Sequence, residues 1–357
     1  MTGVRLMLRC RMPSQLAHLL FAIDSVASAL PTAAAEAILA HRTALGVGAQ
    51  GPDLFLHNRR SKPSALRYGS RLHRAGYGSV LADAALAARR RNADPLGRLA
   101  AYLYGFATHA ALDRFLHPYV NYHSGWFERD HPETLRLRAM HAFLERLIDT
   151  ALVSARCRTV PSALPALAYL DLGRELPDPI VEALEHGLRS QIPAAAADSE
   201  LTTRLNNAYR DARGYYNWAH GDLANARRAA AAHPGPREQR IRALSILHPD
   251  TVPNGLDVLN LRRRRWRDPC PDGRWRNESV PQLYRRALVF GAGAVAELHR
   301  MLSASAAAAV PSYREALRRA VGDSDLSDHY ARRTVCRKRL SRPLPLRRVL
   351  QRLYSEL

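Results

Sequence analysis

Helical periodicity runs through this chain, and it constrains the fold more than any other feature. Apolar residues recur at intervals of three and four along most of the sequence, whereas alternating apolar and polar runs of strand length are missing. A helix buries its apolar stripe against another element, so successive amphipathic helices pack into a bundle. We therefore expect an all-α protein. The predicted helices span 14–29, 32–45, 78–92, 95–117, 132–155, 176–191, 199–230, 237–247, 278–305 and 311–321.

Two irregular segments interrupt the predicted helices. Residues 46–60, GVGAQGPDLFLHNRR, form a glycine-rich break that holds a single carboxylate, Asp53. Residues 248–281 form a long segment with proline, glycine, tryptophan and two arginine clusters. A composition shift with two prolines favours a division of the chain into 12–155 and 156–357. The second part then adds helices and a basic loop that complete the same helical domain or an adjoining one.

The chain is strongly basic, with a net charge of +21, and almost all of its basic residues are arginine. Such a skew is typical of a genome that favours arginine codons, although a basic surface also attracts anionic lipid or nucleic acid. The runs LRRRRWR (261–267) and GRWR (273–276) combine arginine with tryptophan, which suits an anionic interface. Peripheral contact with an anionic membrane is one interpretation. A solvated arginine-rich loop and contact with nucleic acid are the others.

The cysteine pattern and the hydropathy bear on where the protein resides. Four cysteines are scattered without a CxxC pair, which favours free thiols over disulfides or a thiolate zinc site. They are Cys10, Cys157, Cys270 and Cys336. No stretch of about 18 apolar residues lacks charge or histidine, so we expect no membrane span. The N-terminal segment is similar to a signal peptide, but His18 and Asp24 interrupt its apolar run. A cytoplasmic or membrane-peripheral protein is expected, with secretion as the alternative.

The stretch GFATHAALDRFLHPYVNYH (105–123) places His109, Asp113 and His117 four residues apart among apolar neighbours. On a helix, residues four apart lie only about 40° from one another around the axis, so all three share one face. At roughly 1.5 Å per residue, the two histidines lie about 12 Å apart along that face. This separation is too long for one metal ion, because its ligand bonds are near 2 Å. Either the face serves several metal ions or the spacing arises by chance.

Further side chains of the same kind precede and follow this helix. In MHAFLERLID, His141 and Glu145 form a second His-xxx-carboxylate pair that can reach one ion without backbone strain. His73 ends the segment YGSRLH in a predicted loop, and His18 lies on the first amphipathic helix. Core packing or an ion pair between residues four apart explains any one of them. Five separate elements that carry such groups favour a metal site.

The five segments that carry these residues follow one another in a characteristic order. They are MPSQLAHLLFA, GAQGPDLFLHNR, YGSRLH, AYLYGFATHAALDRFLHPYV and MHAFLERLID. With its GPD, spaced His-xxx-Asp and HPY motifs, the span 12–155 resembles the zinc-dependent phospholipase C family, also called the phospholipase C/D domain. The segment LDVLNLRRRRWRDPCPDGRW, followed by SVPQLYRRAL, is similar to the C-terminal part of the family's bacterial members.

The resemblance implies a multi-helix bundle with a metal-binding cleft that holds two or three zinc ions. The residues it implies as ligands are His18, His73, His109, Asp113, His117, His141 and Glu145. His73, His109 and Asp113 would bind one ion, and Asp113 would bridge to a neighbouring ion ligated by His18. His117, His141 and Glu145 would bind a third ion. Imidazole and carboxylate without thiolate also suit zinc that keeps an open coordination position.

Two departures from the family affect the expected ligands. The family's secreted enzymes complete one zinc site with an N-terminal tryptophan, which this chain lacks near its start, so either two or three ions are expected. His117 directly precedes Pro118, which disfavours a continued helix. His123 and His131 are therefore alternatives to His117 as ligands.

These features together predict a zinc-dependent phosphodiester hydrolase that uses a zinc-activated water and acts on phospholipid or a related phosphodiester. Clustered cations offset the charge that develops when water attacks phosphorus. Asp53 matches the family's carboxylate that orients or deprotonates the attacking water, which makes it the candidate catalytic residue. Two other functions stay open: a single-strand nuclease of the same fold, and a metal-binding protein without catalysis.

Overall fold

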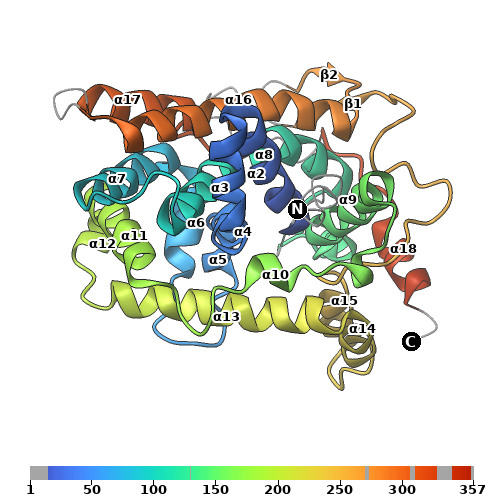
Figure 1. Ribbon diagram of the computed structural model, residues 1–357. Helices are drawn as coiled ribbons and strands as arrows, with labels where there is room; N and C mark the ends of the chain where they lie inside the picture. The colour runs from blue at the N-terminus through green and yellow to red at the C-terminus, as the bar shows by residue number, and fades with distance from the viewer. Residues whose placement is uncertain (1–14, 129, 270–272, 306–309, 328–339, 355–357) are drawn as a thin grey trace.

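The long helix α8 (Arg98–Ser124) lies at the centre of the molecule, and α2 (Gln15–Ala29), α4 (Arg42–Ala49) and α16 (Val280–Ser303) pack against it (Figure 1). Most of its side chains are buried, because it is apolar around most of its circumference, as core helices are. A Cβ atom at Gly105 would lie 2.1 Å from the Leu45 carbonyl oxygen. The close crossing of α4 and α8 therefore requires glycine at this position.

The structure is a computed structural model that describes residues 15–128, 130–269, 273–305, 310–327 and 340–354. Within these ranges, strands occur only in a two-stranded antiparallel hairpin of β1 (Trp266–Arg267) and β2 (Trp275–Arg276). The remaining regular structure is helical, which confirms the predicted all-α class.

Helices from the second half of the chain enclose those from the first. The first half contributes α3 (Thr32–Ala40), α5 (Asp53–Leu56), α6 (Leu66–Arg74), α7 (Tyr77–Arg90), the 3₁₀ helix η1 (Pro132–Leu137) and α9 (Met140–Cys157). The second half contributes η2 (Pro161–Ala163), α10 (Leu167–Leu170), α11 (Asp178–Gln191), α12 (Pro193–Ala196), α13 (Leu201–Gly221), α14 (Leu223–Ala231), α15 (Arg237–Leu244), α17 (Val310–Val321) and α18 (Leu346–Leu353). In Figure 1, α16 and α17 run along the top of the molecule, and α13, α14 and α15 form its lower side.

The apolar interior consists of two clusters of buried side chains, and α8 contributes to both. The first cluster includes Leu103 of α8, and the second surrounds Phe143 of α9 and Trp266 of the hairpin. Each cluster contains side chains from 12–155 and from 156–357. The two parts of the chain are therefore interleaved in the core.

Helix α8 continues past Pro118, so the end predicted for the helix 95–117 is wrong. Proline removes one backbone donor and disfavours helical geometry in the residue before it. The turn that follows nevertheless buries Tyr119 and Tyr122. Tyr119 meets Trp266 edge to face, with ring centroids 5.4 Å apart. Burial of these rings outweighs the local preference of the proline.

The segment around the glycine-rich break is more helical than predicted. Helix α4 ends inside 46–60, and α5 begins at Asp53. His73, expected in a loop, lies in the last turn of α6. The short helices α5 and α6 hold the side chains of Asp53 and His73 at defined positions beside α8.

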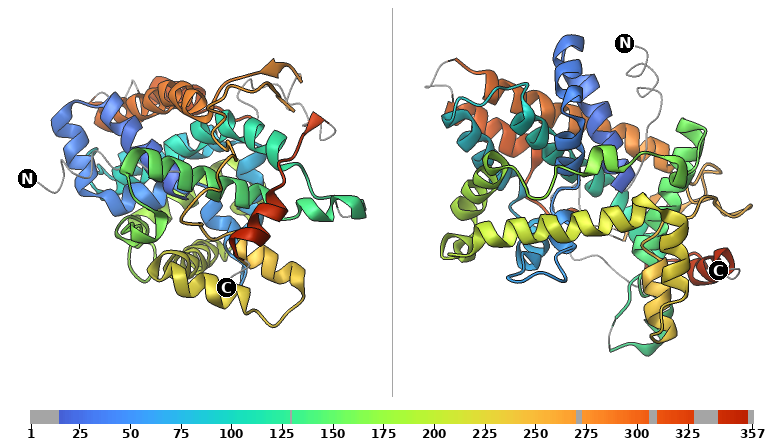
Figure 2. Two further views of the ribbon diagram at one scale, coloured as in Figure 1. Left: turned by 90° about the vertical axis from the view of Figure 1, so that its right-hand side faces the viewer. Right: turned by 60° about the horizontal axis from the view of Figure 1, so that its bottom comes forward.

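Three predicted helices are each broken in the structure, and the first of them, 32–45, divides into α3 and α4 at His41. The segment 132–155 divides into η1 and α9 at Ala139, whose φ is 67°. The segment 199–230 divides at Asp222, whose carboxylate accepts a hydrogen bond of 2.9 Å from the Asn225 N–H and so caps α14. Figure 2 shows α13 and α14 meeting at a sharp angle.

Some expectations fall on residues that the structure does not describe. Cys157 is the last residue of α9, whereas Cys10, Cys270 and Cys336 lie outside the described residues, as does the first residue of the helix predicted at 14–29. Among the described residues, none of the helices has the length and apolar character needed to cross a membrane.

Candidate metal centre

Histidine and carboxylate side chains from five helices converge beside α8, and together they form the histidine–carboxylate cluster. Helix α2 contributes one of them, α5 and α6 one each, α8 three and α9 two. The members are His18, Asp53, His73, His109, Asp113, His117, His141 and Glu145. These are the eight residues that the sequence singled out, and the structure brings all of them together.

Asp113 lies at the centre of the cluster and faces three imidazoles. Its Oδ1 lies 3.2 Å from Nε2 of His18 and 3.5 Å from Nε2 of His117. Its Oδ2 lies 3.1 Å from Nε2 of His109. The rings of His18 and His109 stack, with centroids 4.1 Å apart. One carboxylate thus faces ring nitrogens with both of its oxygens, an arrangement that allows it to bridge two cations.

Asp53 and His73 form the part of the cluster that lies beside His109. Oδ1 of Asp53 is 2.9 Å from Nε2 of His73. Ligand atoms of His73, His109 and Asp113 lie within 4.8 Å of one another, and so do those of His18, Asp53 and His109. Asp53 is therefore a candidate ligand as well as a candidate base.

Gly51 allows the chain before Asp53 to approach α8 closely. Its φ is 52°, and a Cβ atom there would lie 2.4 Å from Cγ of His109. Glycine adopts this left-handed conformation without steric strain and has no side chain to collide with the ring. The glycine of the GPD motif thus has a packing role that any larger residue would disturb.

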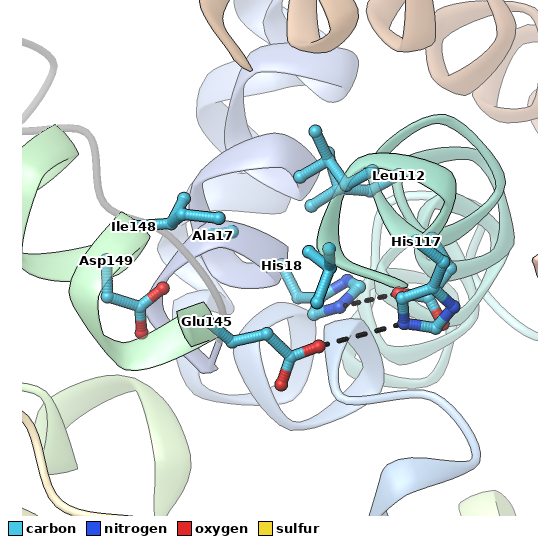
Figure 3. Close-up of a pocket in the computed structure, with 10 residues that line it drawn as sticks. Ala17, His18, Leu112, His117, Glu145, Ile148 and Asp149 are labelled. Atoms are coloured by element: carbon cyan, nitrogen blue, oxygen red, sulfur yellow. Dashed lines mark ion pairs between the residues drawn. The ribbon is translucent and has the colours of Figure 1, made fainter. Parts of the chain in front are cut away.

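His117, His141 and Glu145 form the third part of the cluster, between α8 and α9. Oε1 of Glu145 is 3.1 Å from Nε2 of His141 and 3.7 Å from Nε2 of His117. Figure 3 shows Glu145 extending from α9 toward His117, with His18 beside them. The four-residue spacing on each helix therefore places these groups as the helical geometry predicts.

Hydrogen bonds to backbone carbonyls orient two of the imidazoles. Nδ1 of His73 lies 2.8 Å from the Gly69 oxygen, and Nδ1 of His109 lies 3.0 Å from the Ala49 oxygen. Because a carbonyl oxygen only accepts, each Nδ1 carries a proton, and a neutral ring then presents the lone pair of Nε2. Metal-bound histidines are commonly oriented in this way.

The buried ring nitrogen of His109 gives a direct test of whether the residues fit a metal ion. Its Nε2 has no hydrogen-bond partner among the described residues, although Asp113 lies close to it. A lone pair that faces a carboxylate in a buried site is unfavourable unless a proton or a cation lies between them. The donor set therefore fits a divalent cation.

In the described part of the chain, histidines alone form ion pairs with Asp53, Asp113 and Glu145. Burial by itself raises the pKa of Asp113. The imidazoles of His117 and His109 outweigh burial and hold that pKa well below its usual range. The cluster thus keeps its central carboxylate ionised.

Asp53 and His73 shift each other's pKa in the same way. Burial lowers the pKa of His73, but its hydrogen bond to Asp53 and the charge of that carboxylate raise the value to about 9. For Asp53, burial raises the pKa, and the hydrogen bond and charge of His73 lower it well below its usual range. Both groups are therefore charged near neutral pH when no metal is bound.

Solvent exposure differs strongly among the members of the cluster. The His109 side chain is fully buried, whereas those of Asp53 and His141 are 43% and 41% exposed. A small pocket between α2, α8 and α9 is lined by members of the cluster and by apolar side chains, among them Leu112 and Ile148 (Figure 3). Solvent can therefore reach the candidate metal centre at Asp53 and at His141.

Asp149, which the sequence did not single out, lies one turn beyond Glu145 and lines the same pocket (Figure 3). Its carboxylate accepts a hydrogen bond from Nε2 of His248 and lies 3.5 Å from Nη1 of Arg146. Both the Asp149 and His248 side chains are fully buried. The repeated spacing of four from His141 is a signal that could have revealed Asp149.

The two alternatives to His117 lie outside the cluster. His123 packs against Tyr119 and Tyr122, with ring centroids 4.5 and 4.9 Å apart. His131 is exposed, and its Nδ1 lies 3.0 Å from Oε1 of Glu133. Neither belongs to a group of potential ligands in the part of the chain that the structure describes.

Comparisons of the chain with protein-family models, with curated protein sequences and with solved structures found no match. Fold and site together define an all-α protein with a buried histidine–carboxylate cluster. Its function is inferred below from this geometry and from the motif resemblance.

Proposed function

We propose that this chain is a zinc-dependent phosphodiester hydrolase of the phospholipase C type. One observation carries the proposal: the buried carboxylate of Asp113 faces three imidazoles, of His18, His109 and His117, on two helices. Nitrogen and oxygen ligands without thiolate suit zinc that keeps open coordination positions. The three groups of candidate ligands would hold two or three ions.

The division of the ligands follows the motif resemblance, and two of its three sets are groups whose ligand atoms lie within 4.8 Å of one another. His73 and His109 would hold one ion together with Asp113, and Asp113 would bridge to a second ion beside His18. A third ion would be held by residues of α8 and α9, namely His117, His141 and Glu145. Zinc in such a cluster supplies positive charge for an anionic phosphodiester and lowers the pKa of a bound water.

Asp53 has the properties of a base for this reaction. Its side chain is 43% exposed and begins the short helix α5, whereas Asp113 is almost fully buried. His73 contacts Oδ1 of Asp53, which leaves Oδ2 to accept a proton from the attacking water. The Asp53 carboxylate is ionised at neutral pH and can accept a hydrogen bond from the attacking water.

The motif resemblance favours a lipid over a nucleic acid as the substrate. Leu112, Leu116, Val120 and Ile148 lie beside the candidate ligands, but they are almost fully buried and belong to the core. Sites for single-stranded nucleic acid use aromatic stacking and a basic groove. A phospholipid is therefore the preferred substrate class, and single-stranded nucleic acid is the second candidate because the chain carries a net charge of +21.

Two assays on one purified sample test the proposal. Hydrolysis of phosphatidylcholine vesicles and of a single-stranded DNA oligonucleotide is measured before chelation, after chelation and after zinc is restored. We expect cleavage of the lipid phosphodiester, its loss with chelator and its recovery with zinc. Zinc-dependent cleavage of DNA alone would identify a nuclease. Bound zinc without either activity would identify a non-catalytic metal-binding protein.

A further inference from the structure

The hairpin β1–β2 is fixed to the core by its inner face. Residues directly opposite one another in an antiparallel pair project to the same side of the sheet. Trp266 and its partner Arg276 both point inward and are 0% and 7% exposed. Trp266 packs against Tyr119, and Arg276 donates a hydrogen bond of 2.8 Å to Asp268. These contacts hold the hairpin in a defined orientation on α8.

The outer face of the hairpin combines aromatic and cationic side chains. Trp275, opposite Arg267, is 45% exposed. The guanidinium groups of Arg265 and Arg267 lie over its ring, 5.1 and 5.8 Å from the centroid. Leu261 is 63% exposed, and the four arginines 262–265 that follow it are all exposed. The outer face is therefore aromatic and cationic, and the segment that leads into β1 adds an exposed leucine and four exposed arginines.

Helix α16 extends this surface beyond the hairpin. Its outward residues Val289 and Phe290 are 73% and 54% exposed. Phe290 packs against Phe115, and the guanidinium group of Arg286 lies over the same Phe115 ring. Arg286 also forms an ion pair with Glu278, which follows β2 by two residues. Figure 1 shows the hairpin beside the first turns of α16 at the top of the molecule. The two regions thus form one surface, hereafter the hairpin–α16 surface.

The composition of this surface distinguishes it from the rest of the described chain. Of the six large apolar side chains that are exposed among the described residues, four lie here: Leu261, Trp275, Val289 and Phe290. They lie among the exposed arginines 262–265, Arg274, Arg285 and Arg286. The carboxylates Asp268 and Glu278 are engaged by Arg276. The surface therefore offers positive charge and apolar side chains together.

We propose that the hairpin–α16 surface docks the protein onto an anionic lipid bilayer. Arginines attract anionic headgroups, and apolar side chains enter the boundary between headgroups and acyl chains. A nucleic acid would use the arginines, but it has no place for the exposed aliphatic side chain of Val289. The docking surface stands on these contacts alone, so it does not depend on the proposed hydrolysis.

Sedimentation with vesicles tests the docking surface in the full chain. Vesicles of phosphatidylcholine alone are compared with an equimolar mixture of phosphatidylcholine and phosphatidylglycerol. We expect binding to the anionic vesicles only, with weaker binding as salt is raised, because salt screens exposed charges. Absence of binding to the anionic vesicles would overturn the proposal.

Two variants separate the charged and apolar contributions. Arg262→Gln, Arg263→Gln, Arg264→Gln and Arg265→Gln are combined in the first variant, and we expect it to lower vesicle affinity at least about tenfold at low salt. Val289→Ser with Phe290→Ser forms the second, and we expect a loss of severalfold that persists at high salt. A surface for nucleic acid would instead lose binding of a single-stranded DNA oligonucleotide in the first variant and keep all vesicle binding in the second.

A matched control removes the same charge from the other side of the molecule. Arg210→Gln, Arg228→Gln, Arg237→Gln and Arg242→Gln change four exposed arginines on α13, α14 and α15, which lie opposite α16 in Figure 1. We expect vesicle affinity to stay within about twofold of the unmodified chain, because these charges face away from the bilayer. An equal loss in this variant would mean that net charge, and not the hairpin–α16 surface, drives adsorption.

Discussion

Two ionic groups lie one helical turn apart on α9, and their charges are balanced in different ways. The carboxylate of Asp149 is hydrogen-bonded by His248 and lies beside the guanidinium of Arg146, a permanent cation. Among the described residues, the carboxylate of Glu145 forms ion pairs with His117 and His141 alone. Both carboxylates line one pocket, and within the same residues Asp149 has an arginine as an ion-pair partner whereas Glu145 has none.

This difference indicates which of the two groups depends on a ligand from outside the chain. A buried carboxylate is stable when a fixed cation and hydrogen-bond donors surround it. In the histidine–carboxylate cluster, the partners of Asp113 are imidazoles, and His109 already uses its Nδ1 toward a backbone carbonyl. Metal ions would supply the charge that this cluster lacks, whereas the carboxylate of Asp149 already lies beside a permanent cation, Arg146.

Asp113→Asn should have the largest effect, because Asp113 is the proposed bridge between two ions. The amide cannot neutralise two cations, so we expect the loss of at least one zinc ion per chain. The melting temperature should fall as well, because bound ions stabilise only the folded state. Elemental analysis and thermal unfolding measure both effects. Full zinc content in the folded variant would remove the bridging role.

Asp149→Asn is the matched change in the neighbouring group. It leaves Arg146 and His248 without a carboxylate partner, and breaking a buried pair destabilises a protein by about 3–5 kcal/mol. Zinc content should stay unchanged in the fraction that folds. Chemical denaturation measures the loss of stability, and metal analysis of the folded fraction measures the zinc content. If Asp149→Asn released zinc as Asp113→Asn does, the two groups would not differ in the way described.

Asp53→Asn should separate catalysis from metal binding. The amide keeps the shape of the side chain but cannot accept the proton of the attacking water. We expect turnover to fall by about 10²–10⁴-fold, the typical contribution of a general base, while most of the zinc stays bound. Phosphodiester hydrolysis per bound zinc is the measurement. Full activity of the zinc-loaded variant would exclude Asp53 as the base.

The pH dependence of stability should have opposite signs in the metal-free and zinc-loaded proteins. Without metal, His73 has its pKa raised from 6.5 to about 9, so its contribution is complete below 6.5 and is lost as pH rises through 9. Asp53, with a lowered pKa, loses its contribution only when pH falls below its usual value of 3.8. Zinc requires deprotonated imidazole, so the zinc-loaded protein should gain stability as pH rises.

Melting temperatures near neutral pH and near pH 9, with chelator or with zinc, test this contrast. We expect the metal-free melting temperature to fall over this range and the gap between the two proteins to widen. His73→Gln is the control, because it removes the titrating group and should flatten the dependence of the metal-free protein. A gap that narrows as pH rises would contradict metal binding through imidazole.

The parts of the site that follow from one helix could be predicted from the sequence. The spacing of His109, Asp113 and His117 places them on one face of a helix, and the structure has them on one face of α8. The helical class could be predicted because periodicity is a local property. The end of α8 could not, because packing around Tyr119 overrides the local effect of Pro118.

The parts that depend on distant contacts could not be predicted. Asp149 and His248 are 99 residues apart, and nothing near either residue indicates the other. The sequence predicts a loop at His73, yet α6 forms beside α5 and packs against it. Long-range burial thus decides which polar residues become buried partners, and a single sequence carries little of that information.

Zinc content of the full chain, purified without chelator, tests the central claim most directly. Elemental analysis should give two or three zinc ions per folded molecule, with fewer in Asp113→Asn and no change in Asp149→Asn. A folded, metal-free protein that takes up no zinc on incubation would contradict the account. In that case the lone pair of His109 and the carboxylate of Asp113 would share a proton in place of a metal ion.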